Sequence, residues 1–236
     1  MPCCGCPDYA AHYAAYHNKR TLNDLAAKLQ FQLSDDSLRL LPEYQQRVNV
    51  LKLLRYIDAD SAVQLKGRVA CEVTTCDELV ATELVFENVL TALDPAEIVA
   101  LLSSLVFQQK VDNEPKLTAV LGKGVTEIKR VATKVAQAQQ DCGMDMPVDE
   151  YLRTLHFGLV EVVYAWARGI PFADITELTD VQEGNIVRCI VRLDETCRDV
   201  RNAARVIGDP VLYQKMDEAS VLIKRDIVFA ASLYLN

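Results

Sequence analysis

The 236-residue sequence lacks the short motifs that bind phosphates or catalytic metals in most nucleotide-dependent enzymes and metalloenzymes. No segment reads G-x-x-x-x-G-K-[ST], G-x-G-x-x-G or H-E-x-x-H. The nearest approach to a phosphate loop, Gly122-Lys123-Gly124, has neither the cradle of backbone N–H groups nor the metal-binding hydroxyl. Histidine is also scarce, and His156 is the only one beyond residue 17. The sequence therefore predicts no catalysis and no cofactor for this chain alone.

Long apolar runs and a surplus of basic residues are missing as well. A bilayer-spanning helix needs about 20 apolar residues, and the run from Ile98 to Leu102 is far shorter. The stretch from Met1 to Arg20 has no basic start followed by an apolar segment, so we expect no targeting signal and no membrane partner. The formal charge is -8, which argues against binding nucleic acid through the overall field. Any contact with RNA must be local.

The eight cysteines do not predict disulfides. Five of them are scattered along the chain, at Cys71, Cys76, Cys142, Cys189 and Cys197. In a long chain without a secretion signal such thiols stay reduced, so we expect a soluble protein of the cytosol or nucleus.

A candidate zinc site lies near the N-terminus. Cys3, Cys6, His12 and His17 form C-x-x-C-x5-H-x4-H, and thiolate with imidazole is the usual zinc ligand chemistry. The gap between the second cysteine and the first histidine is shorter than in a zinc finger, and both histidines also suit the surface of a helix. Zinc is therefore the less favoured interpretation, and elemental analysis of the purified protein tests it.

The spacing of apolar residues predicts a mainly α-helical chain in three parts. Residues 1–40 contain an amphipathic stretch, Thr21 to Phe31, that predicts a stalk-like helix. In residues 41–80 a helix leads into two short strands, Val63 to Leu65 and Arg68 to Val73, joined by a Lys66-Gly67 turn. A helix with one β-hairpin is the minimum of a winged-helix module. Residues 81–236 are predicted to form a helical bundle.

After Val73 every signal is helical, and about seven helices are expected. The predicted boundaries are a capping box at Thr75 to Glu78, a second helix start at Asp94-Pro95, a long helix from Thr118 to Gln140, another from Val148 to Arg168, and a break at Gly208-Asp209-Pro210. Short connections between such helices imply antiparallel neighbours.

Seven strings in this order resemble the DSHCT region that closes the superkiller and related exosome-cofactor RNA helicases. They are FQLSDDSLRLLPEYQQRVNVLKLL, LKGRVACEV, DELVATELVFENVL, PAEIVALLSSLVFQ, FGLVEVVYAWARG, VQEGNIVRCIVRLDETCR and IKRDIVFAASLYL. The resemblance that they mark extends over nearly all of residues 31–235. The strings LSDDSLRLLPEYQQR and YAWARGIPF are more similar to the cytoplasmic superkiller branch than to the nuclear, TRAMP-associated branch.

This resemblance implies a longer parent enzyme. Such an enzyme unwinds RNA from its 3′ side with ATP and Mg²⁺ held by motor domains in cis, and feeds the strand to the cytoplasmic RNA exosome together with the other superkiller complex subunits. Residues 1–40 would be the returning part of a stalk, and residues 41–80 the second portion of a split winged helix. The chain would then be a fragment or the product of a truncated gene.

The helix after Gly184 is the candidate RNA contact. A seam with steps of four and three is expected to be buried: Ile186, Ile190, Leu193, Cys197, Val200, Ala204 and Ile207. The opposite face then carries Arg188, Arg192, Glu195 and Asp199. Pattern alone favours an ordinary solvated face. The resemblance instead implies a ratchet helix, on which Arg192 and Glu195 face single-stranded RNA.

Two other hypotheses remain open. One is a freestanding protein-interaction module from a truncated gene. The other is a DNA-binding regulator, because the stretch from Phe172 to Thr179 and the turn through Gly184 have helix-turn-helix spacing. The mixture of Arg with Asp and Glu on the following helix argues against a DNA reader. Near the C-terminus, Lys224-Arg225-Asp226 is either a solvated charged turn or a contact with the motor domains.

Overall fold

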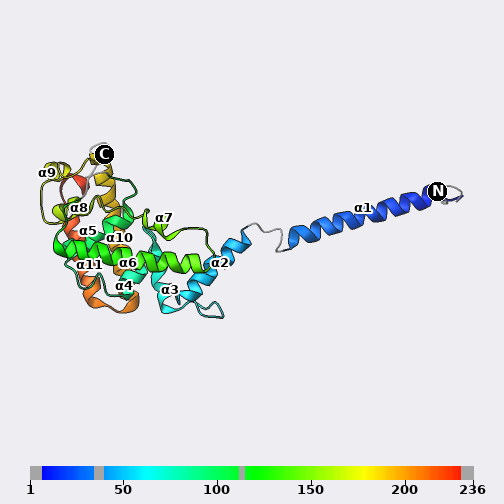
Figure 1. Cartoon of the computed structure of the whole chain (residues 1–236), viewed down its shortest axis with the longest axis horizontal. Coiled ribbons are helices and arrows are strands. Elements are labelled where there is room, and N and C mark those ends of the chain that lie inside the picture. Colours follow the sequence, from blue (N-terminus) through cyan, green and yellow to red (C-terminus); the bar gives the residue numbers. More distant parts are fainter. Residues whose placement is uncertain (1–6, 35–39, 112–114, 230–236) are drawn as a thin grey trace, which may run out of the picture. The chain divides into compact units, whose positions relative to one another are not determined.

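The computed structural model describes residues 7–34, 40–111 and 115–229, which contain eleven α-helices (Figure 1). The chain divides into two compact units, Met1–Gln46 and Arg47–Asn236. The predicted mainly α-helical fold is confirmed. None of the helices in these ranges combines the length and the apolar character that crossing a membrane requires.

The first unit contains one long helix, α1 (Tyr9–Leu33), which runs without interruption for 25 residues. The helix predicted from Thr21 to Phe31 is thus confirmed as part of a longer one. Its large apolar side chains Leu22, Leu25 and Leu29 are exposed. Because isolated helices gain most of their stability from packing, this exposed row predicts a partner for α1.

The predicted β-hairpin between residues 63 and 73 is wrong. The helix α2 (Leu41–Leu53) is followed by a second short helix, α3 (Leu65–Ala70), and the described residues of this region contain only an isolated bridge between Ile57 and Val63. Gly67 lies inside α3 for a steric reason: an added Cβ would lie 2.5 Å from the carbonyl oxygen of Tyr56. The glycine therefore permits close packing of two backbones and does not form a turn.

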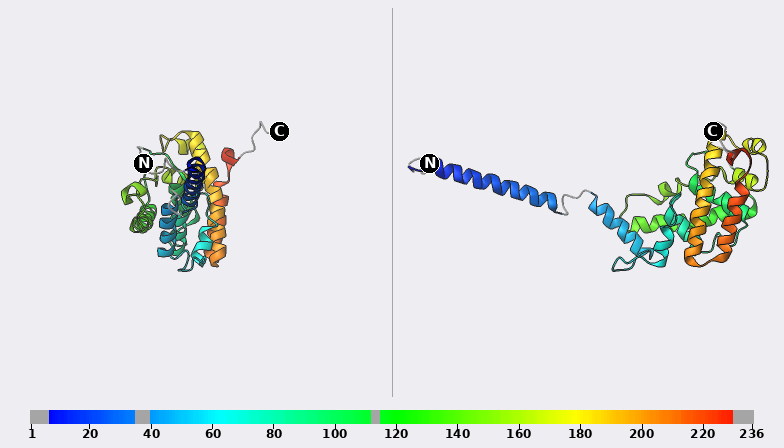
Figure 2. Two further views of the ribbon diagram at one scale, coloured as in Figure 1. Left: turned by 90° about the vertical axis from the view of Figure 1, so that its right-hand side faces the viewer. Right: turned by 180° about the vertical axis from the view of Figure 1, so that it is seen from behind.

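The larger unit is a helical bundle around α5 (Pro95–Val106), whose side chains are almost all buried. Helices α6, α8, α10 and α11 pack against α5. The remaining bounds are α4 (Glu78–Phe86), α6 (Ala119–Asp141), α7 (Val148–Leu152), α8 (Val160–Ala167), α9 (Phe172–Thr176), α10 (Glu183–Ile207) and α11 (Pro210–Ile223), with a final 3-10 turn at Asp226–Phe229. Figure 2 shows α10 and α11 running side by side.

Most predicted helix boundaries in the bundle are confirmed, with two exceptions, at the start of α4 and between Val148 and Arg168. Thr118 precedes α6 and caps it by accepting from the backbone N–H of Leu121, at 3.2 Å. The backbone N–H of Asp94 donates to the carboxylate of Glu97 at the start of α5. At α4, however, Asp77 is the N-cap residue and not Thr75.

The predicted continuous helix from Val148 to Arg168 is wrong, because the chain forms α7 and α8 with a non-helical link between them. In the link, the backbone N–H of His156 donates to the carbonyl of Ser104 on α5, at 3.2 Å. An added Cβ at Gly158 would lie 2.7 Å from a side-chain carbon of Val111. Contacts with distant segments therefore end α7, and Gly158 was the local signal of the break.

Candidate RNA-facing helix

The predicted buried seam of α10 is confirmed. Six of its seven members are buried and Ile207 is partly buried, packed against the same core. The helix ends at Gly208, whose φ of +85° is the left-handed conformation that favours glycine at this position. A regular 3.6-residue period across 25 residues therefore determines which side of α10 faces the core.

A buried carboxylate on α10 fixes the rotation of the helix further. Asp194 is only 4% exposed; it accepts a hydrogen bond from the Ser220 hydroxyl at 2.6 Å and forms an ion pair with Lys224 at 2.9 Å. Arg198 forms an ion pair with it at 3.2 Å. Sequence reasoning missed Asp194, although its place one turn after Ile190 on the apolar seam was a usable signal. These contacts connect α10 to α11 and the segment after it.

The predicted site residues differ in what they do. Arg188, Arg192 and Glu195 are exposed, and the described residues offer Arg188 and Glu195 no hydrogen bond or ion pair. The Nε of Arg192 donates to the Thr75 carbonyl at 3.2 Å. Asp199 is partly buried, and its Oδ2 accepts from the backbone N–H groups of Thr74 at 2.8 Å and Thr75 at 3.1 Å. Asp199 thus anchors the loop that contacts Arg192.

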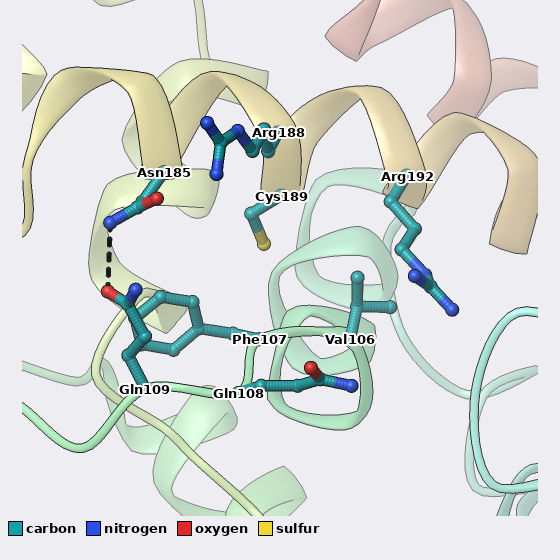
Figure 3. Close-up of a pocket in the computed structure, with 8 residues that line it drawn as sticks. All are labelled: Val106, Phe107, Gln108, Gln109, Asn185, Arg188, Cys189 and Arg192. Atoms are coloured by element: carbon teal, nitrogen blue, oxygen red, sulfur yellow. Dashed lines mark hydrogen bonds between the residues drawn. The ribbon is translucent and has the colours of Figure 1, made fainter.

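A shallow hollow of about 200 Å³ lies between α10 and the segment that follows α5 (Figure 3). Its lining residues are Val106, Phe107, Gln108, Gln109, Asn185, Arg188, Cys189 and Arg192. The amide nitrogen of Asn185 donates to the amide oxygen of Gln109 at 3.0 Å, which ties the two walls together. Burial raises the pKa of Cys189 to about 12, so its thiol is not a nucleophile at neutral pH. The hollow offers guanidinium and amide groups for binding and no catalytic group.

The proposed zinc ligands are only partly described. Cys3 and Cys6 lie outside the described residues. His12 and His17 are exposed on α1, where a separation of five residues turns the side chains about 140° apart around the helix axis. Residues 7–34, 40–111 and 115–229 contain no group of three or more potential ligands that could hold a metal ion.

Removing the Asp199 carboxylate tests its anchoring role. We expect Asp199→Ala to lower the free energy of unfolding by about 1–3 kcal/mol, because two backbone N–H groups and two hydroxyls lose a charged acceptor. Glu195→Ala, one turn earlier on α10, is the matched control and should leave stability nearly unchanged. Urea unfolding followed by circular dichroism measures both, and equal losses would contradict the assignment.

Together these features define a helical domain with a local cationic face and no phosphate-loop motif. The DSHCT (NUC185) domain model matches residues 60–230. The chain is 49% identical over 232 residues to mouse Superkiller complex protein 2, covering 98% of this chain and 19% of that protein. It is 42% identical over 234 residues to Antiviral helicase SKI2 of Saccharomyces cerevisiae, covering 98% of this chain and 18% of the relative. Human Exosome RNA helicase MTR4 is 40% identical over 195 residues, which cover 83% of this chain and 19% of that protein.

The chain belongs to the DSHCT family, and the predicted resemblance to the superkiller-type helicases is confirmed. It spans about a fifth of the length of the curated relatives it matches.

Proposed function

We propose that this chain is the helical domain that closes the RNA channel of an ATP-dependent, 3′-to-5′ RNA helicase of the superkiller type. The observation that carries the proposal is the exposed face of α10, where Arg188 and Arg192 border an open hollow while a buried seam fixes the helix from behind. Helicase channels meet unpaired strands with such cations and with groups that reach base edges.

Each residue of this face has a distinct role in the proposal. The Nε of Arg192 donates to the Thr75 carbonyl. The terminal nitrogens of its guanidinium can therefore bind a phosphate, or the guanidinium plane can stack on a base. Arg188 supplies a second cation, and Glu195 accepts from the edge of a base. Asp199 acts as a positioning residue, because it holds the Thr75 loop on which Arg192 rests.

The proposed parent enzyme supplies what this chain does not. ATP and Mg²⁺ would bind to motor domains in cis, and the other superkiller complex subunits and the RNA exosome would be the protein partners, in the cytoplasm. The identity to superkiller relatives over 98% of the chain supports this branch over the nuclear one. The exposed leucines of α1 support a stalk helix that pairs with a second helix.

Binding of single-stranded RNA by the 236-residue chain tests the proposal. We expect Arg188→Ala with Arg192→Ala to weaken binding by about tenfold or more, because an Arg contact to a base or phosphate contributes about 1–3 kcal/mol. The slope of log affinity against log salt should become shallower, by about 0.7 for each phosphate that the variant no longer neutralises. Fluorescence anisotropy with a labelled oligouridine at several salt concentrations measures both quantities.

Arg205→Ala is the matched control for this experiment. Arg205 is also exposed on α10, but 13 residues after Arg192, which places it about 140° away around the helix. It should leave RNA binding nearly unchanged. An equal loss in both variants would contradict a specific RNA face, and tighter binding to duplex DNA than to RNA would favour the regulator hypothesis.

In the full-length parent helicase, Arg192→Ala with Glu195→Ala is expected to impair unwinding without lowering the melting temperature. The substituted side chains are exposed, so the fold does not depend on them. A strand-displacement assay beside thermal unfolding separates the two effects, and unchanged unwinding would rule out the ratchet role.

A further inference from the structure

The hollow beside α10 continues into two neighbouring hollows. The second shares Phe107 and Gln108 with the first and extends to Arg153 and His156 in the link after α7. The third shares Gln109 with the first and also includes Arg153 and His156. The three hollows therefore adjoin one another, from α10, across the segment after α5, to the link between α7 and α8.

Positive charge predominates along these three hollows. Four cationic side chains line them, namely Lys110, Arg153, Arg188 and Arg192, against two carboxylates, Asp77 and Glu150. The carboxylate of Asp77 accepts hydrogen bonds from the Tyr151 hydroxyl at 2.5 Å and from the backbone N–H of Val80 at 2.9 Å, so both of its oxygens have partners within the bundle. In a chain with a formal charge of -8, such a local surplus favours an anionic ligand.

The third hollow has the composition of a single-strand nucleic-acid site. Its volume is about 460 Å³, within the range of ligand-sized sites. Lys110 and Arg153 are exposed at its rim, and apolar side chains, including Val111, Leu155 and Phe157, complete the lining. Cations combined with apolar and ring surfaces suit a sugar–phosphate backbone that carries unpaired bases.

His156 adds a group that can read a base. Its backbone is held by the Ser104 carbonyl, and its ring meets the ring of Phe107 edge to face, with centroids 6.4 Å apart. Burial lowers the pKa of His156, so the imidazole is predominantly neutral at neutral pH and has one nitrogen that donates and one that accepts. A neutral ring held in this way suits the edge or face of a nucleobase.

We propose that the third hollow is a second RNA subsite, which takes a further nucleotide of the same strand that contacts α10. Lys110 and Arg153 hold phosphates there, and His156 contacts the base. The inference rests on the proposed function, because it extends the RNA path beyond Arg188 and Arg192.

The test compares oligouridines of about 4 and about 12 nucleotides, both within the range of site sizes for single-strand-binding folds. The wild-type 236-residue chain should bind the longer strand more tightly, because only that strand reaches both subsites. In Lys110→Ala with Arg153→Ala, we expect affinity for the longer strand to fall about tenfold, so that most of the gain from length disappears. Binding measured by fluorescence anisotropy at one low salt concentration gives both affinities.

Lys123→Ala with Arg205→Ala is the control, because it removes the same charge from exposed residues that line none of the three hollows. If this control variant loses the tighter binding of the longer strand to the same extent, general electrostatics explains the effect and the subsite is refuted. If the gain from length survives in Lys110→Ala with Arg153→Ala while the Arg188 and Arg192 variant binds weakly, the subsite is refuted and the proposed function stands. The hollow would then be a candidate surface for a protein partner. A wild-type chain that binds neither strand contradicts both proposals.

Discussion

Glu83→Ala is expected to lower the free energy of unfolding by about 3–5 kcal/mol, because it breaks a buried ionic network. The residue is 1% exposed and forms ion pairs with Lys66 of α3 and Lys134 of α6, the latter at 3.1 Å. The Tyr56 hydroxyl donates to the same carboxylate at 3.2 Å, and burial raises the pKa of Tyr56, which keeps it protonated. Removing the carboxylate leaves the half-buried Lys66 ammonium without its anion.

Glu87→Ala is the matched control, one helical turn later. Glu87 also forms ion pairs, with Lys134 at 2.9 Å and Arg130 at 2.5 Å, but its side chain is 23% exposed and both basic partners are about half exposed. Exposed ion pairs contribute little to stability, so Glu87→Ala should lower the free energy of unfolding only slightly. The loss of stability in Glu83→Gln should lie between those of the two alanine variants, because the amide keeps the volume of the side chain and one hydrogen-bond acceptor. Urea unfolding at neutral pH measures all three, and equal stability of the Glu83→Ala and Glu87→Ala variants would show that the network does not stabilise the bundle.

Periodicity predicted those parts of the molecule that depend on local pattern. The seam of α10 and the long helix α6 follow from apolar spacing, and the breaks at Gly208 and Pro210 follow from backbone conformation. The same reasoning placed Arg188, Arg192 and Glu195 on the exposed side of α10. A face opposite a buried seam requires no knowledge of the rest of the fold.

Contacts between distant segments decided the features that periodicity did not predict. Lys66-Gly67 has turn composition, yet Lys66 pairs with Glu83 and Gly67 packs on the Tyr56 backbone, so the segment is helical. Thr75 has capping chemistry, but its hydroxyl is used by Asp199. The opposite wall of the hollow, Gln108 and Gln109, comes from the end of α5, about 80 residues before the cations it faces, and no local pattern connects the two.

The segment after α11 shows the same effect at a charged site. The expected solvated turn at Lys224-Arg225-Asp226 does not describe what Arg225 does. Its guanidinium lies 3.6 Å from the ring centroid of Trp166 and donates to the Trp166 carbonyl at 2.7 Å and the Ile170 carbonyl at 2.5 Å. Lys224 reaches Asp194 on α10. Both basic side chains are therefore used to close the bundle.

Trp166→Ala is expected to destabilise the chain by about 3–5 kcal/mol, because it empties the space of a fully buried ring. Its indole N–H also donates to the Ile223 carbonyl at the end of α11, at 2.9 Å. Trp166→Phe keeps an aromatic ring under Arg225 but loses this hydrogen bond and some volume, so it should cost less. Calorimetry or urea unfolding followed by circular dichroism compares the two.

Arg225→Ala removes the contact of the guanidinium with the Trp166 ring and leaves the ring in place, so its effect on stability can be compared with that of Trp166→Ala. We expect a loss of about 2–3 kcal/mol, from the cation–π contact and the hydrogen bonds to two carbonyls. Trp166 is the single tryptophan, so its fluorescence reports the surroundings directly, and we expect emission to shift to longer wavelength as water reaches the ring. Arg168→Ala, an exposed arginine next to α8, is the control and should change neither quantity. Wild-type emission and stability in Arg225→Ala would show that Arg225 does not hold the end of α11 on α8, and a solvated charged turn would again be the simpler account.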